Sequence, residues 1–483
     1  MSRPVRVRFA PSPTGFLHVG GLRSALFNWL WARHNQGTFI LRLEDTDRAR
    51  LVDGAAAQIE DSMKSLGITP DEGPTQGGDF GPYVQSQRLE LYHKYAQQLT
   101  DSGALYRCWC APERLATLRE HAQKAGLAFK YDRHCLDPKN QKSPKDPHVL
   151  RFRIPDDPTE IRWDDAVRGP LEFKTADLDD FVALKADGYP TYHLANVIDD
   201  HLMEISHVMR ADEWLPSTPK HLLLFEAFGW DLPVFAHLPA VLGPTGGKKL
   251  SKRDGAQSAE EYVSEGYLPE ALMSFLATLG WNDGTTQEVF TPDELIEKFT
   301  LGRIQRSPAR FDRDRLTWIN GLMIRRLETT DLLRQAANCW PEQAEGSDPE
   351  YLAQVIDLVK DRLKFLAELS DLTGFFFSDP TPELPQLIKN YSASEATGHL
   401  QSLMTRLGQV PEADWLHDEL ESAVRGLAQQ SGLHTGHFFG LIRSSITGRT
   451  AAPGLFDTMR VLGRDTTTRR LARAVDFLAD SAK

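Results

Sequence analysis

Long apolar runs are absent from this sequence of 483 residues. No stretch approaches the ~18 consecutive apolar residues that a membrane-spanning helix requires. The amino terminus also lacks the apolar block of a secretory signal peptide. We therefore expect a cytoplasmic protein that does not associate with a membrane. A hydrophobic content of 41% and a charged content of 25% are ordinary for a globular chain, and the length predicts roughly two to four domains.

Cysteine is scarce as well, because the sequence has only Cys108, Cys110, Cys135 and Cys339. In a reducing compartment so few cysteines argue against a disulfide framework. The first three lie close together, and this grouping favours a metal site over a redox site. Cys339 lies far from them, and we interpret it as a core residue.

An excess of positive charge is missing too, since the formal net charge is −12. A nucleic-acid-binding surface would then depend on local basic segments. Residues 301–326 contain seven arginines against two aspartates, and residues 421–483 contain nine basic against five acidic residues. Either segment taken by itself is more often a solvated helix surface, so charge identifies no partner.

The first 44 residues follow the pattern strand, loop, helix, strand. Val5, Val7 and Phe9 alternate with arginines, as in a strand. Prolines interrupt the next segment, residues 22–30 carry one apolar helix face, and residues 39–43 form a second strand pattern. This start, with a glycine pair at the helix entry, predicts a parallel, nucleotide-binding sheet.

Composition divides the rest of the chain. Residues 1–105 and 189–240 are predicted to form the two halves of one α/β, Rossmann-like domain. Residues 106–188, rich in cysteine, lysine and proline, have the character of an insertion. Residues 241–326 are basic, and residues 327–483 show helical spacing with few strand-like runs, which predicts an all-helical region.

The first chemical motif is RFAPSPTGFLHVGG at residues 8–21. His18 and Gly20 lie where a strand ends and a helix begins, and helix-end N–H groups and the helix dipole favour a phosphate there. Glycines let a nucleotide approach the backbone, and a histidine can stabilise charge on phosphate oxygens during attack. In isolation the motif is more often a tight turn with a surface histidine.

The second motif is GGKKLSKRDG at residues 246–255. Its terminal glycines predict a flexible loop, and the three-residue spacing of Lys249 and Lys252 lets one turn direct both ammonium groups to one triphosphate. Such charges stabilise pentavalent phosphorus and departing pyrophosphate. In isolation this motif is more often a basic surface loop.

In this order, with half a sheet between them, the two motifs resemble the HIGH and KMSKS signatures of class I aminoacyl-tRNA synthetases. Longer segments resemble bacterial glutamyl-tRNA synthetases in particular: FAPSPTGFLHVGGLRSALFNWLWAR, LRLEDTDRAR, DGYPTYHLANVIDDHLMEISHVMRADEW and KLSKRDG. Similarity continues, with weaker specificity, through residues 307–312 and into the helical third. Gly21 replaces the last histidine of HIGH, while Leu250 and Arg253 are ordinary variants of the second signature.

The resemblance implies a Rossmann-like catalytic domain with an inserted tRNA acceptor-binding domain at 106–188, a domain at 241–326 with the KMSKS loop and stem contacts, and an all-α anticodon-binding region at 327–483. It implies a set of ATP-binding residues: His18, Gly20, Gly21, Glu213, Trp214, Leu242, Lys249, Ser251 and Lys252. The catalytic residues among them are His18, Gly20, Lys249 and Lys252.

By the same resemblance, a second set binds glutamate: Arg8, Ala10, Ser12, Glu44, Tyr192, Asn196 and Arg210. The residue types fit this role. A guanidinium binds a carboxylate through two parallel hydrogen bonds, and an arginine that recognises the γ-carboxylate rejects glutamine. Glu44 and Ser12 suit the α-amino group.

The implied reaction joins L-glutamate to tRNA-Glu. The α-carboxylate attacks the α-phosphate of ATP in line, with Mg²⁺ bridging phosphate oxygens, and the adenylate then reacts with the 2′-hydroxyl of the terminal adenosine of the tRNA. AMP and pyrophosphate are released. The resemblance also implies that adenylate formation waits for bound tRNA, and we expect a monomer.

Similar insertions in this family carry structural Zn²⁺, and three thiolates suit this ion. Cys108, Cys110 and Cys135 are the expected ligands. The fourth stays open: Asp137 fits the chemistry best, Tyr131 occupies a position that some family members use, and His134 is a further candidate.

Contacts to tRNA are expected from the arginines of residues 303–326 at its inner bend and from the helical region at the anticodon, whose unpaired bases expose edges and faces. Arg443, Arg449 and the turn at residues 453–456 are the anticodon candidates.

Four alternatives compete with this interpretation. A short paralogue that glutamylates a tRNA base lacks the helical region present here. Glutaminyl-tRNA synthetases usually carry PPEPNG in place of APSPTG. An inactive relative that only binds RNA is disfavoured by intact His18, Gly20, Lys249 and Lys252. A nucleotidyltransferase with the same ATP-binding loops has no need of the helical third.

Overall fold

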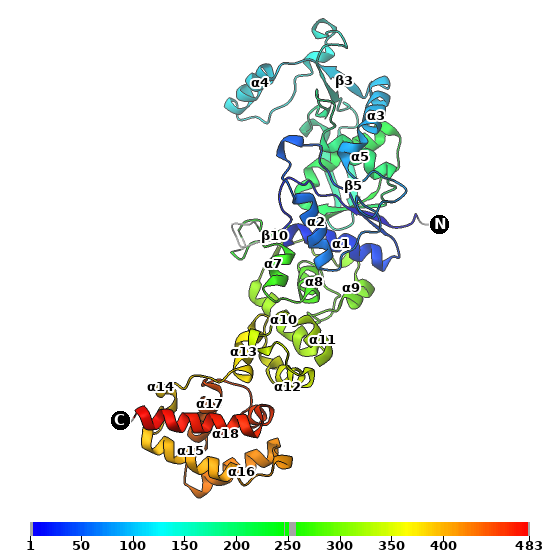
Figure 1. Ribbon diagram of the computed structural model, residues 1–483. Coiled ribbons are helices and arrows are strands. Elements are labelled where there is room, and N and C mark those ends of the chain that lie inside the picture. Colours follow the sequence, from blue (N-terminus) through cyan, green and yellow to red (C-terminus); the bar gives the residue numbers. More distant parts are fainter. Residues whose placement is uncertain (1–2, 246, 251–256, 482–483) are drawn as a thin grey trace. The chain divides into compact units, whose positions relative to one another are not determined.

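The computed structural model describes residues 3–245, 247–250 and 257–481. The chain forms two compact units, both visible in Figure 1. The first comprises residues 1–263 and 269–313, and the second comprises residues 264–268 and 314–483. Both sequence motifs fall within the first unit.

A six-stranded sheet with the order β2-β1-β8-β9-β5-β6 forms the centre of the first unit. Its strands are β1 (Arg6–Phe9), β2 (Thr38–Leu41), β5 (Glu160–Asp165), β6 (Gly169–Lys174), β8 (His207–Ala211) and β9 (Val234–Leu238). Every neighbouring pair is parallel except the β5–β6 hairpin. The predicted parallel, Rossmann-like sheet is therefore confirmed.

Helix α1 (Val19–His34) connects β1 to β2 and is buried on more than the one face that its sequence pattern predicts. One side packs on β1, β2 and β8, and further contacts come from α8 (Pro269–Thr278) and α9 (Pro292–Lys298). This second cover explains why Phe27 and Ala32, outside the predicted face, are fully buried.

The other helices of the first unit are α2 (Ala55–Ser65), α3 (Leu89–Asp101), α4 (Pro112–Lys124), α5 (Tyr192–Leu202), α6 (Thr218–Phe228) and α7 (Ala259–Ser264), of which α7 extends one residue beyond it. Two short strands, β10 (Val241–Leu242) and β11 (Ala309–Arg310), pair in parallel. A third sheet has the order β3-β4-β7, formed by β3 (Leu105–Cys108), β4 (Val149–Phe152) and β7 (Val182–Leu184).

The range predicted as an insertion divides between two sheets. β4 and β7, with most of β3, lie within residues 106–188 and form the small sheet. β5 and β6 come from the same range but are hydrogen-bonded into the six-stranded sheet, where β5 pairs with β9. Side chains of the small sheet, such as Phe152 and Ala183, share one apolar core with α5 and α6.

The second unit consists of helices: α10 (Arg313–Arg326), which begins one residue before it, α11 (Thr329–Gln335), α12 (Pro349–Val359), α13 (Glu368–Phe377), α14 (Leu384–Leu387), α15 (Ala393–Leu407), α16 (His417–Gln430), α17 (Thr435–Thr447) and α18 (Leu455–Ser481). Residues 314–481 contain no strand, so the predicted all-helical region is confirmed. α15 and α18 pack together through residues such as Leu400 and Leu471. Gly463, with φ of 76°, interrupts α18.

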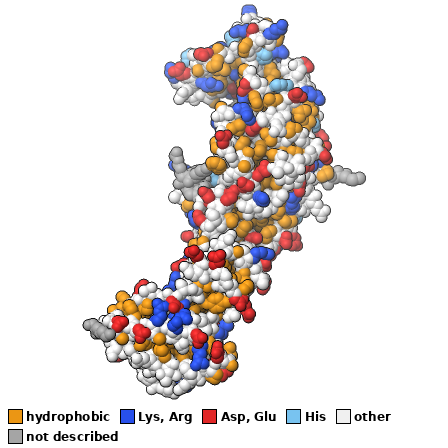
Figure 2. All heavy atoms as spheres, viewed as in Figure 1, with side chains coloured by type: hydrophobic (Ala, Val, Ile, Leu, Met, Phe, Trp, Pro, Cys, Tyr) orange, Lys and Arg blue, Asp and Glu red, His pale blue; other side chains and the backbone are white. Residues whose placement is uncertain are grey.

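Charge is distributed unevenly. Acidic and basic side chains are interspersed on the visible face, and Lys and Arg gather in places on the second unit (Figure 2). None of the described helices combines the length and apolar content needed to cross a bilayer.

Candidate active site

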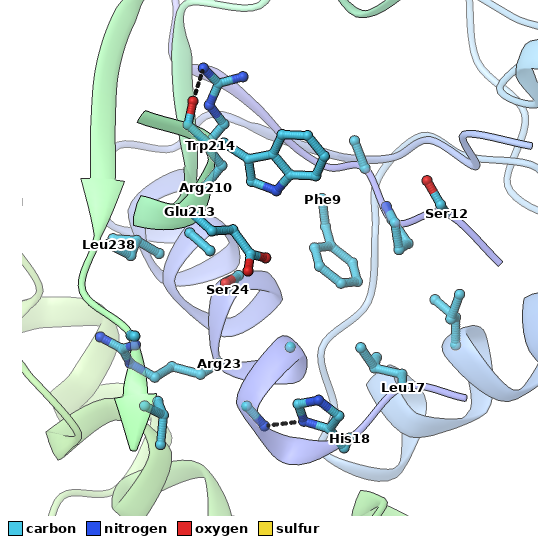
Figure 3. A pocket seen from close by; sticks show the side chains of 18 of the residues that line it. Phe9, Ser12, Leu17, His18, Arg23, Ser24, Arg210, Glu213, Trp214 and Leu238 are labelled. Carbon is cyan, nitrogen blue, oxygen red and sulfur yellow. Dashed lines mark hydrogen bonds between the residues drawn. The ribbon is translucent and has the colours of Figure 1, made fainter. Parts of the chain in front are cut away.

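A cavity of about 460 Å³ lies at the carboxyl ends of β1, β8 and β9 (Figure 3). Open parallel sheets bind their ligands at this edge. The predicted residues that line it are Arg8, Ala10, Ser12, His18, Gly20, Gly21, Glu44, Tyr192, Asn196, Arg210, Glu213, Trp214 and Lys249. Leu242 lies in β10 and is not among the lining residues. Ser251 and Lys252 fall outside the described residues.

His18 is the N-cap of α1, and its ring determines the shape of the helix entry. Its Nδ1 accepts a hydrogen bond from the backbone N–H of Gly20 at 3.1 Å. A neutral imidazole whose Nδ1 accepts carries its proton on Nε2, which is then a donor suited to a phosphate oxygen. A Cβ added to Gly20 would lie 3.0 Å from Cε1 of His18, so a side chain at this position would crowd the imidazole ring.

Of the second motif, the described residues Lys249 and Leu250 line the same cavity as His18. Nζ of Lys249 lies 2.5 Å from Oε2 of Glu213, and the backbone N–H of Leu250 donates to the carbonyl of Val241 at 2.8 Å. Lys249 and Glu213 are each about half exposed, so their ion pair contributes little to stability. Lys249 is therefore available to exchange Glu213 for an anion that enters the cavity.

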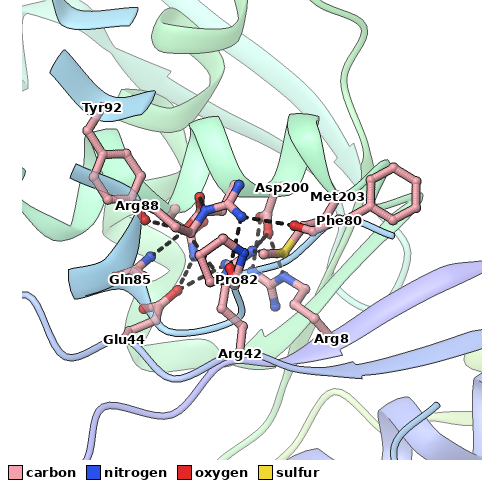
Figure 4. Close-up of polar contacts among 12 residues, drawn as sticks. Arg8, Arg42, Glu44, Phe80, Pro82, Gln85, Arg88, Tyr92, Asp200 and Met203 are labelled. Carbon is pink, nitrogen blue, oxygen red and sulfur yellow. Dashed lines mark hydrogen bonds and ion pairs between the residues drawn. The ribbon is translucent and has the colours of Figure 1, made fainter. Parts of the chain in front are cut away.

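Behind the cavity lies a buried network of three arginines and three carboxylates (Figure 4). It consists of Arg8, Arg42, Arg88, Glu44, Asp199 and Asp200. Arg8 contacts both carboxylate oxygens of Asp200, at 3.0 and 3.1 Å, and Arg42 reaches the same Asp200 at 2.7 Å. The opposite charges balance, as burial of ionised groups demands.

Glu44 joins this network to the cavity. Its Oε1 accepts from Nη2 of Arg42 at 2.9 Å and from Nδ2 of Asn196 at 3.0 Å. Burial raises the pKa of Glu44 above its usual range, although the charges of Arg42 and Arg8 oppose the shift. A cation that enters the cavity, such as an ammonium group, favours the ionised form of this carboxyl.

Arg210 has a different environment from Arg8, because its hydrogen-bond partners among the described residues are neutral acceptors. They are Tyr192 Oη, His221 Nδ1, His237 Nε2, Thr218 Oγ1 and the carbonyl of Trp214, at 2.9–3.4 Å. Burial holds the pKa of His221 well below its usual value. In the part of the chain that the structure describes, no carboxylate forms an ion pair with Arg210.

The three insertion cysteines converge as predicted, with their Sγ atoms all within 4.8 Å of one another. The hydroxyl of Tyr131 lies 3.3 Å from Sγ of Cys108 and 3.4 Å from Sγ of Cys110. Among described residues, the grouped Cys, His, Asp and Glu side chains include neither Asp137 nor His134. Asp137 is exposed and caps the next turn by accepting from the N–H of Lys139. The geometry therefore favours Tyr131 over Asp137 as a fourth ligand.

The side chains of the anticodon candidates in the second unit are less accessible than the sequence indicates. Leu455 and Phe456 are buried in its core and cannot stack on a base. Arg449 forms a two-bond ion pair with Asp371, at 2.8 and 3.1 Å. Burial lowers the pKa of Arg443.

Sequence reasoning missed the residues that support the site from behind. Asp200 and Arg42 lie inside motifs quoted above. However, two adjacent aspartates in a helix, Asp199 and Asp200, give no sign in the sequence that they are buried. Asp165 and His237 carry no motif at all; only the strand pattern around each of them was available as a signal.

Comparison with known proteins gives consistent relationships. Residues 4–318 match the family described as tRNA synthetases class I (E and Q), catalytic domain, and residues 328–475 match an anticodon binding domain. The chain is 44% identical to the glutamate–tRNA ligase of Dehalococcoides mccartyi strain BAV1 and 44% identical to that of Moorella thermoacetica, with 99% of both chains covered in each case.

Two solved structures are also similar. A crystal structure of a glutamate tRNA ligase from Elizabethkingia meningosepticum, in complex with its amino acid, superposes with a TM-score of 0.92 at 35% identity, covering 99% of this chain and 100% of the other. The glutamate-tRNA synthetase of Elizabethkingia anophelis gives 0.87 at 34%, covering 98% and 100%.

Proposed function

Since the chain belongs to the glutamate–tRNA ligases, a family of class I aminoacyl-tRNA synthetases, we propose that the cavity around His18 and Arg210 is where it activates L-glutamate with ATP. The adenylate is then transferred to the 3′-terminal adenosine of tRNA-Glu, with release of AMP and pyrophosphate. The proposal depends above all on one observation: the entry of helix α1 at His18 and Arg210, which has no carboxylate partner among the described residues, line the same cavity.

Glutamate is held by its charges. Arg210 receives a carboxylate of the substrate, because its hydrogen-bond partners among the described residues are neutral, whereas Asp200 already neutralises Arg8. Arg8 and Tyr192 line the same part of the pocket as Arg210. Glu44 and Ser12 bind the α-amino group, and Ala10 and Asn196 close the pocket. Glutamine is rejected because its amide leaves a buried guanidinium without an anion.

ATP occupies the other half of the cavity. His18 donates from Nε2 to the phosphates at the start of α1, and Gly20 and Gly21 leave room for the nucleotide. Glu213 and Trp214 contact the ribose and adenine, with Leu242 and Ser251 as further contacts. Lys249 and Lys252 stabilise the charge that develops on pyrophosphate. Mg²⁺ bound with ATP supplies positive charge at the phosphate oxygens.

No covalent nucleophile of the protein is required. The two substrates are held so that the α-carboxylate of glutamate faces the α-phosphorus, and the rate gain comes from positioning and from fixed positive charge. The 2′-hydroxyl of the terminal adenosine then attacks the adenylate carbonyl, and AMP leaves. Binding of tRNA precedes the first step.

Structural zinc belongs to the same proposal. Cys108, Cys110 and Cys135 provide three soft ligands, and Tyr131 the fourth contact. The ion would tie β3 to the loop that carries Cys135, stabilising the small sheet that we assign to the tRNA acceptor end. We also propose a cytoplasmic, monomeric enzyme whose second unit binds the anticodon.

Aminoacylation tests the function directly. The purified chain is incubated with ATP, labelled glutamate and separate transcripts of tRNA-Glu and tRNA-Gln. ATP-dependent labelling of tRNA-Glu is expected, and the tRNA-Gln arm reveals whether the enzyme also charges that tRNA. Absence of labelling of either transcript by a folded chain refutes the proposal.

A further inference from the structure

Arg210 is hydrogen-bonded to a buried pair of polar residues, His237 and Asp165, that are not among the predicted site residues; His237 contacts it directly and Asp165 contacts His237. Nε of Arg210 donates to Nε2 of His237 at 3.1 Å, and Nδ1 of His237 lies 2.5 Å from Oδ2 of Asp165. The side chains of His237 and Asp165 are fully buried, with 0% exposure. The three residues lie on β8, β9 and β5, which are consecutive strands of the large sheet.

These hydrogen bonds determine which nitrogen of His237 carries the proton. The carboxylate of Asp165 can only accept, so Nδ1 of His237 must be protonated. Nε2 is then an acceptor, as the N–H of Arg210 requires, because a guanidinium only donates. Burial lowers the pKa of His237 and keeps the ring neutral, whereas a doubly protonated ring would direct an N–H at Arg210.

The orientation of Asp165 is itself fixed by the backbone. Its Oδ1 accepts from the N–H groups of Val167, Arg168 and His237 at 3.0, 2.9 and 3.2 Å. Only Oδ2 is left to face the ring. Thr218 adds a second tie, because Oγ1 accepts from Nη2 of Arg210 at 2.9 Å and lies 3.1 Å from Nε2 of His237.

We propose that Asp165 and His237 are positioning residues of the glutamate pocket, which hold the guanidinium of Arg210 in the orientation that receives a substrate carboxylate. The inference rests on the role proposed above for Arg210. Neither Asp165 nor His237 is among the residues that line the cavity, so both act on the substrate through Arg210.

The substitution Asp165→Asn reverses the tautomer while it preserves size. The amide oxygen must keep the place of Oδ1, where three N–H groups point, so the amide NH₂ faces Nδ1 of His237. Nδ1 then accepts and the proton moves to Nε2, which can donate to Oγ1 of Thr218 but no longer accepts from Arg210, so Nε of Arg210 loses its acceptor. The neighbouring exposed Asp164→Asn removes the same charge without reaching the ring and is the matched control.

Steady-state aminoacylation with saturating tRNA separates positioning from a general structural role. Loss of one hydrogen bond to a charged group predicts that Asp165→Asn raises KM for glutamate by about tenfold to a hundredfold. KM for ATP stays within about twofold of the wild-type value, and Asp164→Asn changes neither constant. A lower kcat with both KM values unchanged indicates only a smaller folded fraction and overturns the inference.

A second variant keeps the inference testable if Asp165→Asn folds poorly. His237→Phe removes the acceptor and also raises KM for glutamate. In the His237→Phe background, Asp165→Asn should raise KM for glutamate little further, because no imidazole tautomer remains to reverse. If the effects of the two substitutions on KM are fully additive, the two residues are not coupled and the inference is contradicted. Arg210→Lys distinguishes the two proposals. If it leaves KM for glutamate unchanged, the role of Arg210 itself fails, whereas a raised KM with unaffected Asp165→Asn refutes the positioning role alone.

Discussion

Removal of the charge of Asp200 tests the buried network behind the cavity. Asp200 accepts three hydrogen bonds from Arg8 and Arg42, and the side chains of all three residues are at most 3% exposed. Asp200→Asn leaves three arginines against two carboxylates and turns an amide NH₂ toward a guanidinium. Breaking a buried pair in this way costs about 3–5 kcal/mol. We therefore expect the free energy of unfolding of the first unit to fall by about that amount.

Urea unfolding followed by tryptophan fluorescence measures this loss. Asp187→Asn is the control, because Asp187 pairs with Lys185 at 3.2 Å on the surface, where such pairs contribute less than about 1 kcal/mol. If Asp200→Asn lowers the free energy of unfolding no more than Asp187→Asn does, the network does not stabilise the fold.

The acid side of the stability profile provides a second measurement. Burial alone would raise the pKa of Asp200, but the charges of Arg8 and Arg42 outweigh it and the pKa lies below its usual range. A carboxyl with a lowered folded-state pKa stabilises the fold above its unfolded pKa of about 3.9, and this stabilisation is lost as the pH falls through the folded value. The wild-type protein should therefore lose more stability than Asp200→Asn when the pH is lowered below about 4.

Three further predictions concern the site and the metal. Lys252→Ala should leave folding intact yet lower the rate of glutamate activation by orders of magnitude, because transition-state charge loses its partner; near-normal tRNA-dependent pyrophosphate exchange would contradict this role. In Gly20→Ala the new Cβ would meet the ring of His18 at 3.0 Å, so KM for ATP should rise and kcat should fall, whereas Gly398→Ala, in α15 and with open space around it, should have little effect. Elemental analysis should find about one equivalent of zinc, and Tyr131→Phe should reduce it; a content far below one equivalent in the wild type would end the zinc hypothesis.

Local patterns were sufficient to predict much of this site. The strand, proline-rich loop and glycine pair around His18 are contiguous in sequence, so the helix entry and its histidine follow from a short segment. The parallel sheet and the helical second unit likewise follow from hydrophobic spacing over single elements. Family resemblance then supplied residues such as Arg210 and Glu44, whose environments the sequence alone does not describe.

What could not be predicted depends on contacts between distant segments. Asp165 and His237 are 72 positions apart and meet only because β5 inserts beside β9. The acidic pair before His201 resembles a solvated helix surface, yet the packing of α5 buries both carboxylates among arginines. Position in the sequence gives no sign of either arrangement, because strand order in a sheet is not chain order.

The β5–β6 hairpin has a consequence for any attempt to exchange modules between synthetases. A chimaera that replaces residues 106–188 as one block would transplant most of the β3-β4-β7 sheet but would also remove two strands of the six-stranded sheet, and with them Asp165. Grafts that retain residues 160–174 of the host spare those strands. The boundary that matters for recombination therefore runs inside the apparent insertion, because β5 and β6 belong to the six-stranded sheet.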